Sequence, residues 1–404
     1  MTETKYSKHF LMDTKSVIDF VKDNLPDFFA EDADLEASEI GDGNINYVFK
    51  VVDKKNGKSL VVKQADIYLR SSGRPFDTHH NKIEYEILAT EGRLAPGYVP
   101  EIYNYNEAMC ALTMEDVSEY KNLRKEMMTG KTFEKLADDI TTFMADTLLP
   151  TTDLILDRHE KKKKVQLFTN IECCDITEDL VLTEPYYNYK NQNTITKGEE
   201  DFVKENLYDN EHLHAEVGYL RNNFMNNAQA LLHGDLHSGS IFVNNSGIKV
   251  LDPEFAFYGP MGYDIGNVIG NMFFAWANKA VTDSDNSQFL TWVKEQIEEM
   301  YDLTYEKLSK KYDEQVKFPL YNTEFKKNYL ASVMADSMGY AGTEMIRRTV
   351  GDSKVAEVTS VTDHDQRVKV DETLIKTGMI FIENRGEFSN GSDITKVFEE
   401  ELIK

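Results

Sequence analysis

One stretch near the middle of the chain, residues 231–270, restricts the possible folds more than any other. It reads LLHGDLHSGSIFVNNSGIKVLDPEFAFYGPMGYDIGNVIG and contains two acidic clusters, at residues 233–237 and 252–254. Between the clusters lie two apolar runs that are separated by an Asn-Ser-Gly turn. Apolar runs joined by a short turn of this kind predict a β-hairpin. We therefore expect two strands that hold the acidic clusters close together.

This arrangement is typical of phosphoryl transfer. In such enzymes one carboxylate accepts the proton of the attacking hydroxyl, while other carboxylates hold Mg²⁺ against the nucleotide phosphates. Asp235 has the position of the base and Asp252 that of a metal ligand. For a single Asp, a solvated turn would be the better interpretation, but the complete string with its hairpin favours phosphoryl transfer.

Two residues depart from the pattern of protein kinases. Those enzymes place a metal-binding Asn where this chain, counted on from Asp235, has Ser240, so a neutral amide ligand is lost. The usual Asp-Phe-Gly reads Asp-Pro-Glu, and Glu254 supplies a second hard oxygen donor that suits Mg²⁺. We interpret the two departures as one linked change in the metal site.

The size and charge of the chain narrow the class of protein. A chain of 404 residues exceeds what one hydrophobic core usually organises, so we expect two lobes. The formal net charge of -25 argues against nucleic acid or an anionic membrane as a partner, because both require basic patches. The acidic excess itself is best explained by solubility.

The cysteines and the apolar runs predict a cytoplasmic protein. The three cysteines, Cys110, Cys173 and Cys174, are odd in number and two are adjacent, which indicates no disulfide framework and suits a reducing compartment. We expect neither a signal peptide nor a membrane-spanning segment, since no apolar run has the required length and flanking residues.

The N-terminal part predicts a nucleotide-binding sheet. After a helix at residues 14–25 with Thr14 as its N-cap, the glycine turn at residues 41–44 precedes a strand, an Asn-Gly turn and a returning strand at residues 59–64 that carries Lys63. Glycines let backbone amides approach phosphate oxygens, and a lysine reaches the same phosphates as a point charge. An ordinary hairpin with a solvated edge lysine is the alternative. The acidic clusters downstream favour the nucleotide interpretation. The residues of the turn are Gly41, Asp42, Gly43 and Asn44.

A helix at residues 81–91 follows, and it offers Glu84 or Glu86 as a partner that would fix Lys63 for the phosphates. Two further strands, at residues 99–103 and 111–114, end at a break in the pattern. In a two-lobed nucleotide enzyme this break would be the hinge whose backbone binds adenine, here at Glu115 and Val117.

From residue 132 onward the apolar period is mostly helical. We expect helices at residues 132–148, 262–280, 288–311 and 323–341, and leave residues 157–198 without a function. The resulting organisation is an N-lobe at residues 1–114, a hinge at 115–119 and a helical C-lobe at 120–404.

Two features of the C-lobe have two interpretations each. Asp264 either caps the helix at residues 262–280 or braces the catalytic loop through backbone amides. Arg347 and Arg348 form a fork suited to phosphate and sugar oxygens, but cations are also favoured at a helix C-terminus, and the residues alone favour this second explanation.

Together these motifs resemble the 5-methylthioribose kinases, a branch of the protein-kinase-like fold that also holds the aminoglycoside phosphotransferases and choline kinases. The string that contains His233 and Asp235 is shared across small-molecule kinases, whereas Ser240 combined with Asp-Pro-Glu narrows the match. The motifs are GDGNINYVF at 41–49, HGDLHSGSIFV at 233–243, DPEFAFYGPMGYDIG at 252–266 and the twin arginines at 347–348.

The resemblance implies an α+β, bilobal kinase-like fold with a small β-rich N-lobe and a larger helical C-lobe. It implies that Asp235 activates the anomeric hydroxyl of 5-methylthioribose, that Asp252 and Glu254 bind Mg²⁺, and that ATP phosphates lie at Lys63 and the glycine turn. Against the explanation drawn from the residues alone, Arg347 and Arg348 would face the sugar. A role in methionine salvage, and usually a homodimer, are also implied.

One departure from the family concerns the loop before the first N-lobe helix. Many members have Trp-Pro there, whereas this chain has Arg74-Pro75, which weakens a nucleotide-covering role for the loop. Alignment on that proline selects Glu84 over Glu86 as the partner of Lys63. The alternatives to a methylthioribose kinase are a kinase of another small alcohol, such as an aminoglycoside, choline or a deoxysugar, and a non-catalytic nucleotide-binding protein.

Overall fold

The computed structural model describes residues 5–40, 46–68 and 77–404. The predicted phosphate-binding turn at Gly41–Asn44 and the Arg74-Pro75 loop lie outside the described residues. Among the helices that are described, none has the length and apolarity needed to cross a lipid bilayer.

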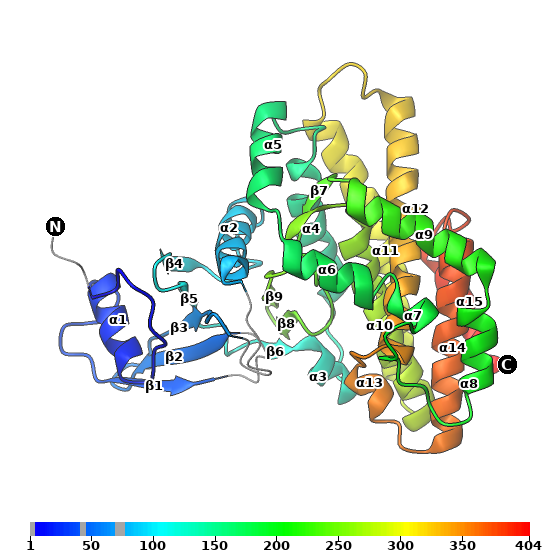
Figure 1. The fold of residues 1–404 in the computed structure, drawn as a ribbon, viewed down its shortest axis with the longest axis horizontal. Coiled ribbons are helices and arrows are strands. Elements are labelled where there is room, and N and C mark those ends of the chain that lie inside the picture. Colours follow the sequence, from blue (N-terminus) through cyan, green and yellow to red (C-terminus); the bar gives the residue numbers. More distant parts are fainter. Residues whose placement is uncertain (1–4, 41–45, 69–76) are drawn as a thin grey trace. The chain divides into compact units, whose positions relative to one another are not determined.

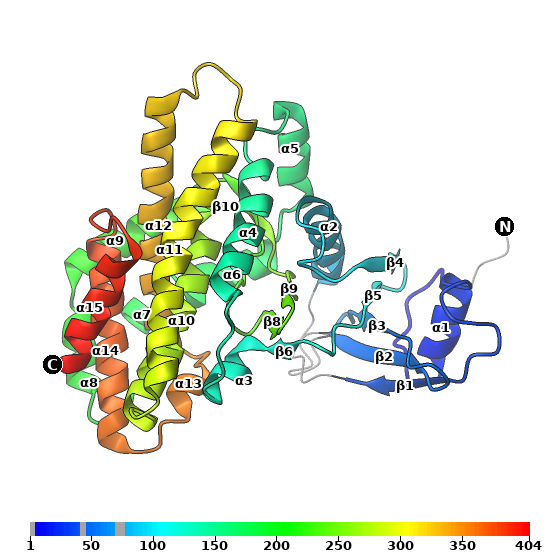
Figure 2. The ribbon, with the colours of Figure 1, turned by 180° about the vertical axis from the view of Figure 1, so that it is seen from behind.

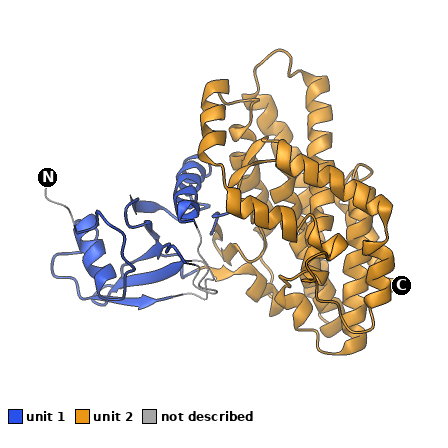
Figure 3. Cartoon of the chain, viewed as in Figure 1, with its two compact units in different colours: residues 1–119, 251–255 blue, residues 120–250, 256–404 orange. Residues whose placement is uncertain are grey.

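Contacts divide the chain into two compact units (Figure 3). The first unit contains residues 1–119 together with the short segment 251–255, and the second contains the rest of the chain. Asp252 and Glu254 therefore group with the N-terminal residues, whereas Asp235 groups with the later residues.

The first unit is built on one five-stranded antiparallel sheet (Figure 1). The predicted hairpin around the Asn-Gly turn is present, and Gly57 has the positive φ of +79° that this turn requires. The strand that carries Lys63 is the central one. The strands are β1 (Leu35–Glu39), β2 (Tyr47–Asp53), β3 (Ser59–Gln64), β4 (Ile102–Asn106) and β5 (Ala111–Glu115), in the spatial order β1-β2-β3-β5-β4.

Two helices accompany this sheet, α1 (Ser16–Asn24) and α2 (His79–Leu94). The apolar stripe of α1 is buried in one core with side chains of β2 and β3, as its periodicity predicted. The prediction of Thr14 as N-cap is wrong. Lys15 precedes the helix without a side-chain cap, and the carboxylate of Asp13 accepts the amides of Lys15 and Ser16 instead, because Asp13 lies at the turn that leads into the helix.

The second unit is mostly helical (Figure 2). The segment that the sequence pattern left without a function contains three short helices. Small sheets are formed by β6 (Lys121–Asn122), β8 (Ile241–Asn244) and β9 (Gly247–Val250), and by β7 (Ala230–Leu232) with β10 (Phe257–Gly259). The helices of at least eight residues are α4 (Leu136–Leu148), α5 (Arg158–Leu167), α6 (Ile171–Leu180), α9 (Glu211–Asn226), α10 (Gly262–Thr282), α11 (Ser287–Gln315), α12 (Thr323–Val350), α14 (His364–Glu383) and α15 (Gly391–Ile403). The shorter ones are α3 (Leu123–Met128), α7 (Glu184–Tyr187), α8 (Glu200–Val203) and α13 (Ala356–Thr359).

Helix α12 is longer than predicted and packs between α10 and α14. Glycines allow this close approach: a Cβ on Gly266 of α10 would collide with the carbonyl oxygen of Ser337, and one on Gly342 of α12 with that of Gly378. The helix continues nine residues past the predicted end at Ala341. The prediction stopped early because the last turns bury charged side chains, which interrupt the apolar pattern in the sequence. The tight packing sets the position of the functional residues at its C-terminal end.

Candidate active site

The first unit contains a cluster that we call the lysine centre, formed by Lys63, Glu84, Asp252 and Glu254. Nζ of Lys63 lies 2.7 Å from Oε1 of Glu84 and 2.8 Å from Oδ1 of Asp252. Burial lowers the pKa of Lys63, but the carboxylates of Asp252, Glu84 and Glu254 outweigh it and raise the pKa well above 10.5. Lys63 is therefore a charged ammonium at neutral pH, held by α2 on one side and by the 251–255 segment on the other.

The predicted choice between Glu84 and Glu86 is decided by α2. Glu84 is fully buried on the face of α2 that carries its ion pair with Lys63. Burial raises the pKa of Glu84, and the neighbouring ammonium opposes that rise. Glu86 lies two residues further along the helix, which turns it to a different face.

The two predicted metal ligands lie in the same short segment. Asp252 has a φ of +61°, an uncommon conformation that Asp tolerates better than most residues. Oε2 of Glu254 accepts a hydrogen bond of 2.8 Å from Asn46, whose own Oδ1 lies 3.1 Å from Nε2 of His80. The link of Glu254 to Asn46, and through it to His80, was not predicted, because it joins residues 208 positions apart in the chain.

The donor set of this segment fits Mg²⁺. That ion commonly takes one or two carboxylates and completes its octahedral shell with phosphate oxygens and water. Asp252 and Glu254 supply hard oxygens of this kind. Within residues 5–40, 46–68 and 77–404 there is no group of three or more His, Cys, Asp or Glu side chains arranged for a metal ion.

The second unit contains the aspartate centre, formed by Asp235, His237, Glu344, Arg347 and Arg348. Nη2 of Arg348 lies 3.9 Å from Oδ1 of Asp235, and Nε2 of His237 lies 3.5 Å from Oδ2. Burial raises the pKa of Asp235, but the His237 ring and the two guanidiniums outweigh it and hold the pKa below 3.8. Asp235 is thus a carboxylate at neutral pH, which is the form that accepts a proton.

The loop that carries Asp235 is fixed by its own backbone. Asp264 accepts the amides of His233 at 2.7 Å and Gly234 at 3.0 Å, so of its two interpretations the structure shows the brace. Met261, not Asp264, is the residue that precedes α10. Gly234 has a φ of +82°, which explains the glycine at this bend. His233 is buried, and its Nδ1 accepts the amide of Asp235 at 3.3 Å.

The hydroxyl of Ser240 forms hydrogen bonds within this loop. Its Oγ accepts the amide of His237 at 2.9 Å and lies 2.9 Å from the carbonyl oxygen of Asp235. The hydroxyl therefore closes the turn after the base. These contacts give Ser240 a place in the geometry of the loop.

Glu344 is a residue of the aspartate centre that the sequence pattern did not reveal. Its Oε2 accepts Nε of Arg347 at 2.8 Å and its Oε1 accepts Nε of Arg348 at 2.9 Å. The twin arginines are therefore buried on a carboxylate, and Arg348 faces Asp235, which is not the arrangement of solvated cations at a helix end. The spacing of three and four residues on one helix was the available signal.

The proposed hinge lies at the end of β5. The amide of Glu115 donates to the carbonyl oxygen of Glu101 at 2.8 Å, so this amide belongs to the sheet. Asp116 next to it binds Lys50 at 2.6 Å and Ser59 at 2.6 Å, and these contacts hold its pKa at about 2 despite partial burial. Val117 follows outside any strand.

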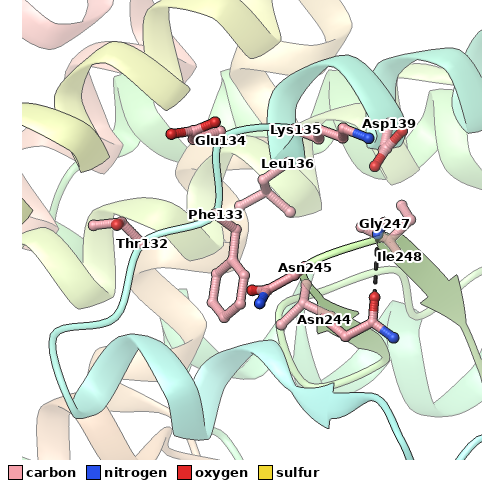
Figure 4. Close-up of a pocket in the computed structure, with 11 residues that line it drawn as sticks. Thr132, Phe133, Glu134, Lys135, Leu136, Asp139, Asn244, Asn245, Gly247 and Ile248 are labelled. Atoms are coloured by element: carbon pink, nitrogen blue, oxygen red, sulfur yellow. Dashed lines mark hydrogen bonds between the residues drawn. The ribbon is translucent and has the colours of Figure 1, made fainter.

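A cavity of about 330 Å³ in the second unit contains none of the predicted site residues (Figure 4). It lies between the start of α4 and the turn that joins β8 to β9. Lys135 and Asp139 line one side, and Asn244 on the other side accepts the amide of Gly247 at 3.2 Å. We assign no ligand to it.

Comparison with known proteins supplies the family. Residues 36–294 match the model of the phosphotransferase enzyme family. A methylthioribose kinase of a Geobacillus species is 34% identical over 378 residues, covering 93% of this chain and 92% of the relative. One of Escherichia coli is 36% identical over 374 residues, covering 88% of each chain.

The chain belongs to the methylthioribose kinase family. The resemblance seen in its motifs is thereby confirmed. The predicted α+β fold of the kinase-like type is confirmed by the phosphotransferase match together with the sheet of the first unit and the helices of the second. As a methylthioribose kinase family member the chain is an enzyme of the transferase class, and its two centres can be interpreted by that chemistry.

Proposed function

We propose that this protein transfers the γ-phosphoryl group of ATP to the anomeric hydroxyl of 5-methylthioribose, giving 5-methylthioribose 1-phosphate and ADP. The observation that carries the proposal is the 34–36% identity to proteins named methylthioribose kinase over about nine tenths of the chain. The lysine centre and the aspartate centre contain the residue types that the two halves of this reaction require.

The lysine centre is proposed to bind the nucleotide phosphates. Lys63 supplies the positive charge, and Glu84 holds its ammonium in place. Asp252 and Glu254 would hold Mg²⁺, which supplies charge neutralisation at the phosphate oxygens. Gly41, Asp42, Gly43 and Asn44 would add backbone amides to the same phosphates.

The aspartate centre is proposed to act on the sugar. Asp235 accepts the proton of the anomeric hydroxyl as the hydroxyl oxygen forms its bond to the γ-phosphorus and the bond to the bridging oxygen of ADP breaks. Arg347 and Arg348 would bind sugar and phosphate oxygens through terminal nitrogens, since Glu344 occupies the Nε of each and the carbonyl oxygen of Ser353 accepts from Nη1 of Arg348. His233, Ser240 and Asp264 keep the loop in shape.

The remaining expectations are proposals of the same kind. Residues 1–114 would form the nucleotide-binding lobe, 115–119 the hinge with Glu115 and Val117 at the adenine, and 120–404 the catalytic lobe. We also propose a cytoplasmic homodimer that takes part in methionine salvage and binds neither nucleic acid nor membrane.

The decisive experiment is ADP release measured across a panel of small alcohols with ATP and Mg²⁺. We expect the highest kcat/KM with 5-methylthioribose. Higher kcat/KM with an aminoglycoside, choline or a deoxysugar would replace the proposed substrate, and ATP binding without turnover of any panel member would indicate a non-catalytic nucleotide-binding protein.

A further inference from the structure

His237 lies next to the proposed base, yet the reaction as described assigns it no role. Its Nε2 is 3.5 Å from Oδ2 of Asp235, and its side chain is only 15% exposed. The other oxygen of that carboxylate faces Arg348. Each oxygen of Asp235 is therefore faced by a different nitrogen donor, one cationic and one from an imidazole.

The second ring nitrogen determines which nitrogen of His237 carries the proton. Nδ1 lies 3.0 Å from the amide nitrogen of Gly239 and 3.2 Å from the amide nitrogen of Ser240. The Ser240 amide also donates to the carbonyl oxygen of His237. A backbone amide only donates, so Nδ1 must present its lone pair. In a neutral imidazole the proton then lies on Nε2, the nitrogen that faces Asp235.

The loop is built around this ring. A Cβ on Gly239 would lie 2.7 Å from Cε1 and 3.0 Å from Nδ1 of His237, so only glycine lets the backbone amide approach the ring. Ser240 closes the same turn through the amide of His237. Gly239 and Ser240 therefore both help to hold the loop around the His237 ring.

The surroundings keep the ring neutral. Burial lowers the pKa of His237 to about 4, and Arg124 and Arg348 act in the same direction against Asp235 and Glu344. A protonated ring would also place an N–H on Nδ1 against the two amides. A neutral donor orients a carboxylate while reducing its proton affinity less than another full positive charge would.

We infer that His237 is a positioning residue, locked as the Nε2–H tautomer by the amides of Gly239 and Ser240, that orients the Asp235 carboxylate toward the substrate hydroxyl. The inference rests on the proposed function, in which Asp235 is the base. The separation of 3.5 Å is long for a hydrogen bond, and we expect it to shorten when substrate is bound, as catalytic hydrogen bonds often do.

Two substitutions separate the functions of the two nitrogens. His237→Asn keeps an acceptor near Nδ1 but removes the donor, and we expect kcat to fall about 10- to 100-fold, with the KM of both substrates within about twofold and little change in Tm. His237→Gln places a donor near Nε2 but removes the acceptor, and we expect higher kcat than in His237→Asn together with a lower Tm.

His364→Asn, the same change at an exposed histidine of the second unit, is the matched control and should leave kcat and Tm unchanged.

Several results would overturn the inference. These are unchanged kcat in His237→Asn, a loss that appears in KM instead of kcat, or the failure of both variants to fold, which would make the ring a requirement for folding alone.

A two-bond ¹H–¹⁵N correlation spectrum of the wild-type protein provides an independent readout. We expect Nδ1 of His237 to be unprotonated at pH 7, with the signal assigned by its loss in either variant, and a protonated Nδ1 would also overturn the inference. If wild type releases no ADP with methylthioribose, the proposed function fails, whereas the tautomer still tests this inference.

Discussion

The lysine centre and the aspartate centre combine charges in opposite ways. In the first unit one ammonium is shared among three carboxylates, a formal excess of two negative charges. In the second unit Glu344 and Asp235 face Arg347 and Arg348, so the formal charges balance. Carboxylates in excess at one site repel one another unless a cation compensates them, which makes the lysine centre the one suited to a divalent cation.

The largest expected effect is on the base. Asp235→Asn should lower kcat about 10²- to 10⁴-fold, because an amide cannot accept the substrate proton. ATP affinity, which we assign to the lysine centre, should stay within about twofold, and both quantities are measured by steady-state ADP release and calorimetry. Asp365→Asn, the same substitution at a fully exposed carboxylate of the second unit, is the control. Full activity of Asp235→Asn would remove the assigned base and with it the contrast between the centres.

Replacement of Lys63, the ammonium shared by the carboxylates, should have the next largest effect. We expect this effect in the stability of the first unit and in ATP binding. Lys63→Met leaves a buried carboxylate without its partner, and we expect a loss of about 3–5 kcal/mol in the unfolding free energy together with weakened ATP binding. The double variant Lys63→Met/Glu84→Gln should recover part of the stability because one buried charge is also removed.

Tryptophan fluorescence can test whether Lys63→Met destabilises the first unit alone. Trp276 and Trp292 are the two tryptophans of the chain, and both belong to the second unit. In Lys63→Met, hydrogen exchange in β3 and α2 should accelerate while the tryptophan fluorescence midpoint in urea moves little. A fluorescence shift as large as the change in exchange would mean that the units do not unfold separately.

For Glu344, which pairs with Arg347 and Arg348, we expect the loss of stability in the second unit instead of the first. Glu344→Gln should cost about 3 kcal/mol at pH 7 and lower the tryptophan fluorescence midpoint. Burial raises the pKa of Glu344, but Arg347 and Arg348 outweigh it and hold the pKa well below its ordinary value of 4.5.

The sign of the pH dependence follows from this shift. A carboxyl whose pKa is lowered by folding stabilises the protein above its unfolded pKa, and this contribution disappears as pH falls through the folded pKa. The difference in unfolding free energy between wild type and Glu344→Gln should therefore be complete above about pH 4.5 and shrink in more acidic solution. A difference that grows on acidification would contradict the assigned ion pairs.

The smallest effect concerns the second metal ligand. Glu254→Ala removes one of two hard oxygens, and the Mg²⁺ concentration for half-maximal activity should rise about tenfold while the KM for methylthioribose changes less than twofold. Titration of activity with Mg²⁺ at saturating ATP measures the effect. The opposite result, a change in sugar KM alone, would separate Glu254 from the metal and end the proposed link with Ser240.

The residues by themselves determined the reaction class and the order of the elements that carry Lys63, Asp235 and Asp252. The spacing of Asp235 and Asp252 around an Asn-Ser-Gly hairpin depends on local backbone geometry, which adjacent residues largely set, and the same holds for the Asn-Gly hairpin before Lys63. The strand β1 was missed because its alternation of polar and apolar residues is weak, and Thr14 was a wrong cap because its competitor Asp13 is one residue away.

Only the tertiary structure decided how these residues are held. The contact of Asp235 with Arg348 joins positions 113 residues apart, and the choice of Glu84 over Glu86 depends on the face that α2 turns to β3. The place of Glu344 near Asp235, unlike its pairing with the two arginines of its own helix, depends on the packing of α12 between α10 and α14. Such contacts arise from packing between distant elements, and no local spacing encodes them.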